Sequence, residues 1–243
     1  MIEVKAISKS FGEVKAVKEV TFTAPNNQVT ALLGANGAGK TTSLRMIYSL
    51  ITPDAGQVLI DGIDPKEQPE AARKLLGVLP DTRGLYLRLT ARENIEYFGQ
   101  LHGMNDDDIK SRTESLVKDL RMEDFIDRKT DGFSQGQRVK VAIARALVHD
   151  PQNIILDEPT NGLDVMSTRG VRAFLNKEKQ RGKCILFSSH VMQEVSAVSD
   201  EILVVSDGKV RASGTELELH QQTGQKNLED AFVHIVTNGE GHE

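Results

Sequence analysis

The chain has 243 residues, with 30 basic and 35 acidic side chains and a net charge of −5. This length suffices for one large domain or two closely packed lobes, and the interspersed charges offer no basic surface for nucleic acid. The single cysteine, Cys184, excludes an internal disulfide, and no apolar stretch approaches the roughly 18–20 residues that span a bilayer. We therefore expect a soluble chain, for which other subunits would supply any membrane span.

Residues 2–7 and about 13–23 alternate apolar and polar side chains around Ser10-Phe11-Gly12. This pattern predicts an antiparallel hairpin with one exposed face. Phe11 lies at the turn, where its ring could stack on a nucleobase, an interaction that contributes about 1–3 kcal/mol elsewhere. Packing of the ring into the local core is the alternative, and the sequence leaves both roles open.

The next segment is a glycine-rich loop that matches the phosphate-binding pattern G-x-x-x-x-G-K-[ST] at every fixed position: Gly34-Ala35-Asn36-Gly37-Ala38-Gly39-Lys40-Thr41. The residues before it (29–33) are typical of a strand buried on both faces, and those after it predict a helix to about Leu50. Glycines let several backbone amides point at one anion, and the helix dipole adds positive charge there. Lys40 would reach the outer phosphates, and the Thr41 hydroxyl would help to hold Mg²⁺. A plain turn is the alternative, but the matched flanks favour a nucleoside triphosphate site.

Short apolar runs at 57–60 and 75–79 predict further strands. Thr90 and Glu93 form a capping box that opens a helix to about residue 102, and two more helices are predicted over about 106–122 and 134–149. From residue 151 the α/β pattern resumes, with apolar runs at 153–156, 184–187 and 202–205, a turn at Asp207-Gly208, and short helices at about 215–223 and 227–237. Residues 238–243 are expected to fray.

These elements predict an α/β fold of the P-loop NTPase type, with a mostly parallel sheet, an N-terminal antiparallel β subdomain and an inserted helical lobe. We expect a single domain over residues 1–243. Its core lobe would cover about 1–83 and 151–214, the helical lobe about 84–150, and the C-terminal helices about 215–237.

The strand predicted over 153–156 ends in two carboxylates, Asp157 and Glu158. Adjacent strand residues face opposite ways, so the two acids should differ in role. Asp157 suits the hydrated Mg²⁺ beside Thr41, and Glu158 could orient, or take a proton from, the water that attacks the γ-phosphate. His190 follows the strand at 184–187 and should lie at the same edge of a parallel sheet, where it could donate to the γ-phosphate. A solvated turn for the acids and a capping role for the histidine are the alternatives.

A further motif, Phe133-Ser134-Gln135-Gly136-Gln137, precedes an apolar helix and is similar to the signature of the ATP-binding cassette (ABC) ATPases. Ser134 and Gln137 also form a capping box, which alone would be only structural. However, the phosphate loop, this signature, Asp157-Glu158 and His190 follow the family's order and spacing. The resemblance therefore covers essentially the whole chain.

The resemblance implies the ABC ATPase fold and hydrolysis of ATP with Mg²⁺. Phe11 falls at the position that stacks on adenine, and Asp164 closes the loop Asn161-Gly162-Leu163-Asp164, which crosses to a partner cassette. Ser134 and Gly136 would contact the γ-phosphate bound by the other subunit's loop from Gly34 to Thr42, and Gln135 and Gln137 belong to the same nucleotide-binding motif. ATP would thus lie between two cassettes in a head-to-tail dimer.

Three positions depart from the family's usual pattern. Gln135 stands where the family usually has glycine, and the crossing loop reads Asn-Gly-Leu-Asp instead of Ser-Ala-Leu-Asp. Asp81 occupies the place of a glutamine that touches Mg²⁺ and couples to the membrane subunit. Because a carboxylate is a good Mg²⁺ ligand, Asp81 is a candidate for this metal.

Residues 79–86 and 228–232 resemble the single-cassette ATPases of bacterial exporters, most nearly those of the sodium-extrusion type. This resemblance implies membrane-spanning partner subunits docked near residues 81–88, a second cassette that is expected to be a copy of this chain, no nucleic acid, and a cytoplasmic location at the inner face of the cell membrane. A soluble ABC ATPase acting on nucleic acid or the ribosome is the alternative. Members of that kind usually carry two cassettes or long coiled coils, and this chain has one cassette and no sustained heptads.

Overall fold

The computed structural model describes residues 1–82 and 84–238, so Arg83 of the predicted docking loop and residues 239–243 of the end predicted to fray lie outside the described residues. Asn238, also predicted to fray, belongs to the last helix. Within these ranges the strands are β1 (Ile2–Phe11), β2 (Val14–Ala24), β3 (Gln28–Leu33), β4 (Ala55–Ile60), β5 (Leu76–Leu79), β6 (Asn153–Asp157), β7 (Cys184–Ser189), β8 (Glu201–Ser206) and β9 (Lys209–Gly214). The helices are α1 (Lys40–Ile47), α2 (Pro69–Lys74), α3 (Ala91–Leu101), α4 (Asp106–Leu120), α5 (Gln135–Leu147), α6 (Val165–Gln180), α7 (Met192–Val198), α8 (Glu216–Thr223) and α9 (Leu228–Asn238).

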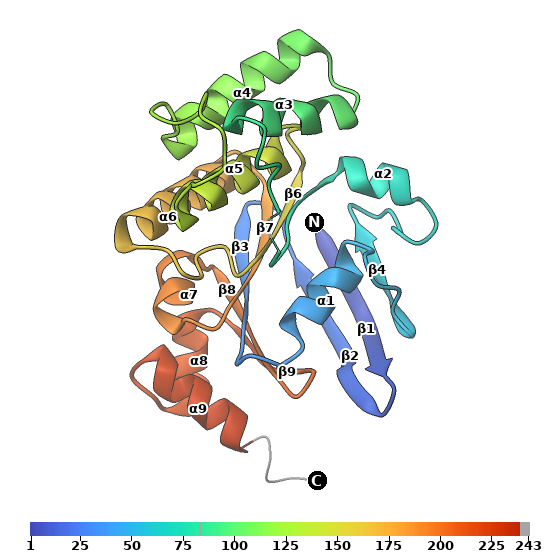
Figure 1. Cartoon of the computed structure of the whole chain (residues 1–243). Helices are drawn as coiled ribbons and strands as arrows, with labels where there is room; N and C mark the ends of the chain where they lie inside the picture. The colour runs from blue at the N-terminus through green and yellow to red at the C-terminus, as the bar shows by residue number, and fades with distance from the viewer. Residues whose placement is uncertain (83, 239–243) are drawn as a thin grey trace.

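Two sheets form the framework of the fold (Figure 1). The larger sheet has the order β5-β6-β7-β3-β8-β9, in which β9 alone runs antiparallel to its neighbour. The smaller sheet, β2-β1-β4, is antiparallel throughout. The predicted mostly parallel sheet and N-terminal antiparallel subdomain are therefore confirmed.

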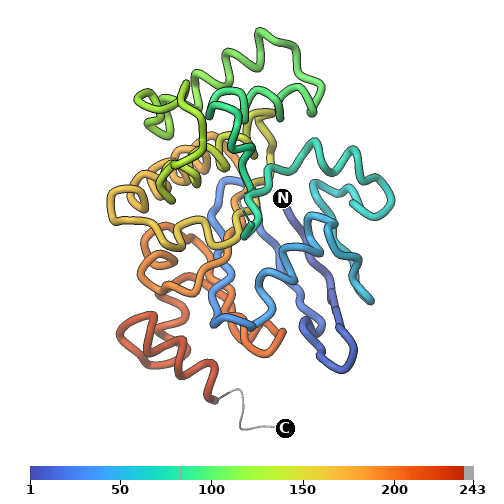
Figure 2. Tube along the Cα trace, in the orientation of Figure 1, coloured from blue at the N-terminus to red at the C-terminus, as the bar shows by residue number. Residues whose placement is uncertain are grey.

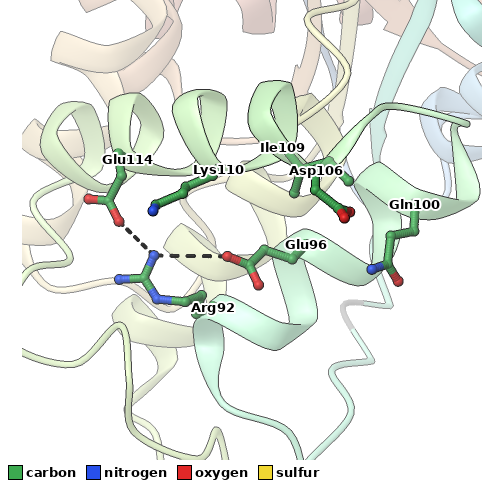
Figure 3. Close-up of a pocket in the computed structure, with 7 residues that line it drawn as sticks. All are labelled: Arg92, Glu96, Gln100, Asp106, Ile109, Lys110 and Glu114. Atoms are coloured by element: carbon green, nitrogen blue, oxygen red, sulfur yellow. Dashed lines mark hydrogen bonds and ion pairs between the residues drawn. The ribbon is translucent and has the colours of Figure 1, made fainter.

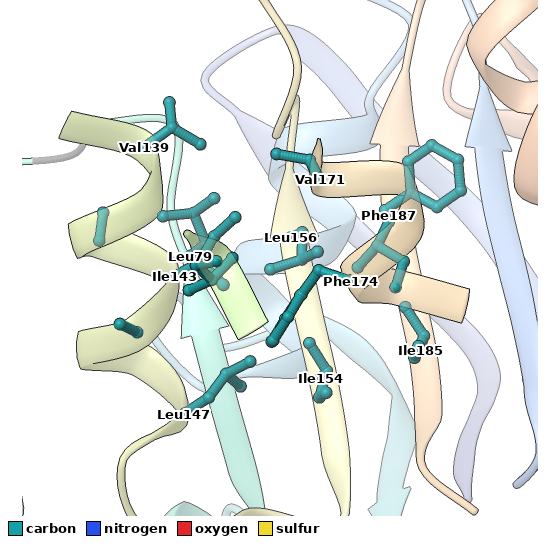
Figure 4. Close-up of a cluster of buried hydrophobic side chains, with 14 of the residues drawn as sticks. Leu79, Val139, Ile143, Leu147, Ile154, Leu156, Val171, Phe174, Ile185 and Phe187 are labelled. Carbon is teal, nitrogen blue, oxygen red and sulfur yellow. The ribbon is translucent and has the colours of Figure 1, made fainter. Parts of the chain in front are cut away.

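The strands of the larger sheet are buried on both faces because a hydrophobic cluster covers each side. On β6, Ile154 and Leu156 pack with Phe174 of α6 on one face, whereas Ile155 packs on the other face with α1 and the smaller sheet. Figure 4 shows the first of these faces, where side chains of α5 and α6 meet β5, β6 and β7. Helix α1 lies between the two sheets and fixes the phosphate loop that precedes it.

Helices α3, α4 and α5 follow β5 and precede β6 along the chain, and they pack on one another. Helices α3 and α4 lie at one end of the molecule, and α5 lies between them and the larger sheet (Figures 1 and 2). The predicted capping box of α3 is present, since Thr90 accepts from the amide of Glu93 and the Glu93 carboxylate accepts from the amide of Thr90. No helix among the described residues combines the length and apolar character that crossing a bilayer requires.

One local prediction was wrong, and one helix was missed. The helix after the phosphate loop ends at Ile47 and not near Leu50, because Ser49 adopts a positive φ of 61° and the amide of Leu50 turns back to the carbonyl of Arg45 at 2.8 Å. Helix α2 was not predicted; it spans only six residues and begins at Pro69, whose fixed φ suits the first turn of a helix.

Candidate active site

The phosphate loop has the backbone geometry that its glycines require. Gly39 caps α1 in the left-handed region, at φ 101°, where an added Cβ would lie 2.6 Å from the carbonyl oxygen of Ala16. Within the described chain, the amides of Asn36, Gly37 and Gly39 donate to no carbonyl or side chain. These three residues line a concavity of about 180 Å³ together with Lys40, Thr41, Thr42 and Glu158. Such amides at a helix N-terminus form a binding site for a phosphate group.

Lys40, Glu158 and His190 meet at the carboxyl edge of the sheet although they come from three distant parts of the chain. The Lys40 ammonium lies 3.4 Å from Glu158 Oε1 and donates to the carbonyl of Gly34 at 2.7 Å. Nδ1 of His190 is 2.9 Å from Glu158 Oε2. The predicted clustering of these three side chains at one strand edge is what the parallel topology produces.

Asp157 ends β6 and is fully buried, while Glu158 turns out of the strand at φ 48° and is partly exposed. Their different surroundings therefore arise from the end of the strand and not from alternation along it, which corrects the reasoning from sequence. Burial raises the pKa of Asp157, and the hydroxyls of Ser188 and Thr41 oppose this by lowering it.

The residues around Asp157 fit a divalent cation. Its Oδ1 accepts from Ser188 at 2.5 Å, whereas Oδ2 is buried with no hydrogen-bond partner among the described residues. A buried carboxylate oxygen without a partner is costly unless a cation or a donor completes it. With the Thr41 hydroxyl nearby, the donors are hard oxygens of the kind that Mg²⁺ prefers.

Asp81 lies close to this carboxylate but is engaged elsewhere. Both of its oxygens lie within hydrogen-bond distance of Arg45 Nη2, at 3.2 and 3.1 Å. The negative charge of Asp81 contributes to the raised pKa of Asp157, so the two carboxylates are close enough to repel each other. Asp81 would have to leave or share Arg45 in order to bind a metal.

The signature residues begin α5 and lie against the crossing loop. Ser134 caps the helix by accepting from the amide of Gln137, so the predicted capping box is present. Gly136 packs against Ser167, whose Oγ would lie 2.5 Å from an added Cβ and which donates to Asp164 Oδ2 at 2.7 Å. Among the described residues, those that line the concavity of the phosphate loop include no member of the signature.

Gln135 is exposed and lies beside Gly162 of the crossing loop, where a Cβ added to the glycine would be 3.9 Å from Gln135 Cγ. Phe11 is 50% exposed at the tip of the β1–β2 hairpin, with Lys9 Nζ 5.8 Å from its ring centre. Of the two roles predicted for the Phe11 ring, packing into the core is therefore wrong.

A separate cavity of about 370 Å³ lies between α3 and α4, away from the phosphate loop (Figure 3). Three of its charged residues form one network, in which Arg92 pairs with Glu114 at 2.7 Å and with Glu96 at 4.0 Å. Burial raises the pKa of Glu96. We assign this network to holding α3 against α4.

Sequence reasoning missed two residues that position the site. Ser188 accepts from the Glu158 amide at 2.9 Å while it donates to Asp157, so one hydroxyl holds both acids. Glu194 of α7 accepts from the Thr160 hydroxyl and so ties the segment after Glu158 to the helix after His190. The run Ser188-Ser189-His190 at a strand end was the available signal for the first, and the sequence held none for the second.

Comparison with known proteins gives a consistent picture. The family model described as "ABC transporter" matches residues 17–161. The ABC transporter ATP-binding protein NatA of Bacillus subtilis (strain 168) is 45% identical over 227 residues, which cover 93% of this chain and 92% of the relative. The Nod factor export ATP-binding protein I of Rhizobium meliloti (strain 1021) is 35% identical, with 88% of this chain and 64% of the relative covered. Among solved structures, a dimeric post-hydrolysis state of the ATP-binding cassette MJ0796 bound to ADP and Pi superposes with a TM-score of 0.80 at 28% identity, covering 88% of this chain and 98% of that one.

Proposed function

The chain belongs to the ABC transporter family and is an ATPase of that family, and on this basis we propose that it powers a bacterial exporter as a paired cassette bound to membrane-spanning subunits. One observation carries the proposal: Lys40, Glu158 and His190 converge beside the backbone amides of the phosphate loop at one sheet edge. Open parallel sheets bind their ligands at this edge. In this proposal the chain lies in the cytoplasm at the inner face of the membrane.

We propose the following roles for the site residues. The amides of the phosphate loop and the Lys40 ammonium bind the outer phosphates, and Lys40 exchanges its contact with Glu158 for the γ-phosphate. Glu158 then orients the attacking water and takes its proton, and His190 donates to the γ-phosphate. Thr41 and Asp157 would hold Mg²⁺, which supplies charge neutralisation on the phosphates when bound. Asp81 is a further candidate ligand if Arg45 releases it.

Pairing of two cassettes is the second part of the proposal. Ser134 and Gln135 are exposed at the start of α5, where the helix dipole offers a second anion-binding end. These residues and Asp164 would meet the nucleotide held by a partner cassette, and Phe11 would stack on adenine from the same chain. To invert a 1:99 population of open and closed pairs, ATP must bind the closed pair about 5.5 kcal/mol more tightly. Phosphate contacts shared between two chains are a plausible source of that difference, and the similar MJ0796 cassette is itself described as dimeric.

The membrane partner would dock at residues 81–88. Tyr86 and Leu87 are each 50% exposed there, and Tyr97 of α3 lies beside Tyr86 with ring centres 5.6 Å apart. Exposed large apolar residues in one patch are typical of an interaction surface. The name of the Rhizobium relative supports export, and the sequence likeness of residues 79–86 and 228–232 favours the sodium-extrusion type. In this view the lobe at about 84–150 transmits motion from the nucleotide to the membrane subunits.

Replacement of Glu158 tests the catalytic core of the proposal. In Glu158→Gln the amide cannot take the proton from water, so ATP hydrolysis should fall by about 10²–10⁴-fold while Mg-ATP binding is kept. Steady-state phosphate release and equilibrium binding measure the two quantities, and light scattering with Mg-ATP should show a dimer of the variant. Glu114→Gln, which alters an acid in the α3–α4 network, is the control and should hydrolyse ATP normally. Undiminished turnover in Glu158→Gln would remove its catalytic role.

A further inference from the structure

A groove of about 660 Å³ runs between α4, α5 and α6 and shares no lining residue with the concavity of the phosphate loop. Its walls come from the end of α4, the second turn of α5 and the part of α6 between Met166 and Lys177. Its lining combines cationic side chains with two buried apolar ones: Lys118, Arg121, Lys140, Arg169, Leu120 and Phe174. Neither the proposed catalytic mechanism nor the proposed membrane dock uses any of these residues.

The charge in this groove is unusual for the chain. Lys118, Arg121, Lys140 and Arg169 form no ion pair with any described residue, while the fifth cation, Lys177, pairs with Asp119, the one acid that lines the groove. The whole chain has five more acids than bases, yet these four cations without an ion pair in the described chain gather here, and two nearby acids, Glu123 and Asp164, act on Lys140. Like charges so placed repel one another, and an anion in the groove would relieve that repulsion.

The cations converge from three separate elements. Lys140 is half-buried, and its ammonium donates to the backbone carbonyl of Arg121 at 3.2 Å, so the two residues share one wall. Burial and the charge of Arg121 lower the pKa of Lys140, and the charges of Glu123 and Asp164 oppose this only in part. Arg169 joins them from α6, where Gly170 leaves open space beside it.

We propose that this groove binds a small soluble anion carrying several phosphate groups, of the nucleoside polyphosphate class. Its volume lies within the range of small-ligand pockets, about 300–1,000 Å³. Arginine and lysine together favour phosphate oxygens, and the buried apolar lining at Leu120 and Phe174 can take a ring or sugar. A concave site lined by cations suits a compact anion better than the flat surface of a bilayer or a long acidic segment. This assignment does not depend on the proposed transport function.

Titration calorimetry with inorganic tripolyphosphate tests the site directly. The full chain is first saturated with Mg-ADP, with Mg²⁺ in excess of both ligands, so that the phosphate loop is already filled. We expect one further site per chain. The double variant Arg121→Gln with Arg169→Gln should weaken the affinity of this site for tripolyphosphate by about tenfold or more for each cation removed. Each charge-assisted contact is worth about that factor.

Arg73→Gln with Lys74→Gln removes the same charge from exposed positions on α2 and is the matched control, which should change binding less than about twofold because of screening. If the groove variant has a lowered urea midpoint, Lys140→Met, which keeps an unbranched side chain, replaces it in the comparison. Absence of a second site, or equal weakening in both double variants, would overturn the proposal. So would binding of a short RNA, a polyglutamate peptide or anionic vesicles at the groove in place of tripolyphosphate.

Discussion

Replacement of Ser188 by alanine isolates the hydrogen bonds that hold the two acids. The Ser188 hydroxyl is fully buried, donates to the Asp157 carboxylate at 2.5 Å and accepts from the Glu158 amide at 2.9 Å. A hydrogen bond to a charged group contributes about 1.5–3 kcal/mol, and a buried amide left without an acceptor costs about 1–3 kcal/mol. With partial relaxation, Ser188→Ala should lower the free energy of unfolding by about 2–4 kcal/mol.

Urea unfolding followed by circular dichroism measures this loss. With a denaturant slope of about 3 kcal/mol per molar, the midpoint should fall by roughly 1 M. Ser189→Ala is the matched control, because Ser189 is equally buried on the same strand but its hydroxyl oxygen, within the described chain, accepts only from the amide of Val191. We expect about 1 kcal/mol for that change.

The same variant bears on the metal site. Without the Ser188 hydroxyl, Asp157 loses a group that lowers its pKa and fixes its orientation, so half-maximal ATP hydrolysis should require more Mg²⁺. A Ser188→Ala protein with an unchanged urea midpoint and an unchanged Mg²⁺ requirement would refute the idea that this hydroxyl holds Asp157 in place.

Three further predictions concern other parts of the molecule. Gly136→Ala should destabilise the chain by about 1–3 kcal/mol because its Cβ meets Ser167 Oγ, whereas in a Ser167→Ala background, where only the Cβ contact at 3.2 Å remains, the same change should cost less than about 1 kcal/mol in urea. Burial holds the pKa of His149 at about 4, below its usual 6.5, so only the unfolded state gains this proton between those values and stability should fall by up to about 3 kcal/mol as pH drops from 6.5 to 4. In His149→Phe, thermal melts over that range should show a shallower pH dependence, and an identical slope would contradict the assignment. Arg45→Gln should change stability by less than about 1 kcal/mol, since the pair is partly exposed, but it should lower the Mg²⁺ needed for half-maximal ATPase if the freed Asp81 binds the metal.

Much of this fold is readable from local sequence. The phosphate loop follows from a pattern whose spacing alone fixes its backbone, and the continuous apolar runs that became β3, β6 and β7 predicted a sheet covered on both faces. Because those strands are parallel, their carboxyl ends had to bring Lys40, Glu158 and His190 to one edge. The capping boxes at Thr90 and Ser134 marked the starts of two helices in the same local way.

The remaining features depend on registers and packings between distant segments. Ser188 reaches Asp157 only because these two residues are partners in the β6–β7 ladder. The contact of Gly136 with Ser167 depends on how α6 passes α5, and the engagement of Asp81 by Arg45 depends on how α1 lies beside the end of β5. The residue pattern of a single segment cannot predict such contacts between distant side chains. The cationic groove has the same origin, since its residues are spread over more than 50 positions of sequence.

The attachment of α3, α4 and α5 has a mechanical consequence. The chain leaves the larger sheet at the end of β5, its outermost strand, and returns at the start of β6, the adjacent strand. These helices are therefore joined to the sheet through two adjacent strands at one side, β5 and β6, and α5 also packs on β5. Because β5 and β6 are parallel, the outgoing connection begins at the edge of the sheet where Asp81 and Asp157 lie, whereas the returning connection enters β6 at the opposite edge. A displacement of the helices relative to the sheet would therefore reach the acids beside the phosphate loop through Asp81.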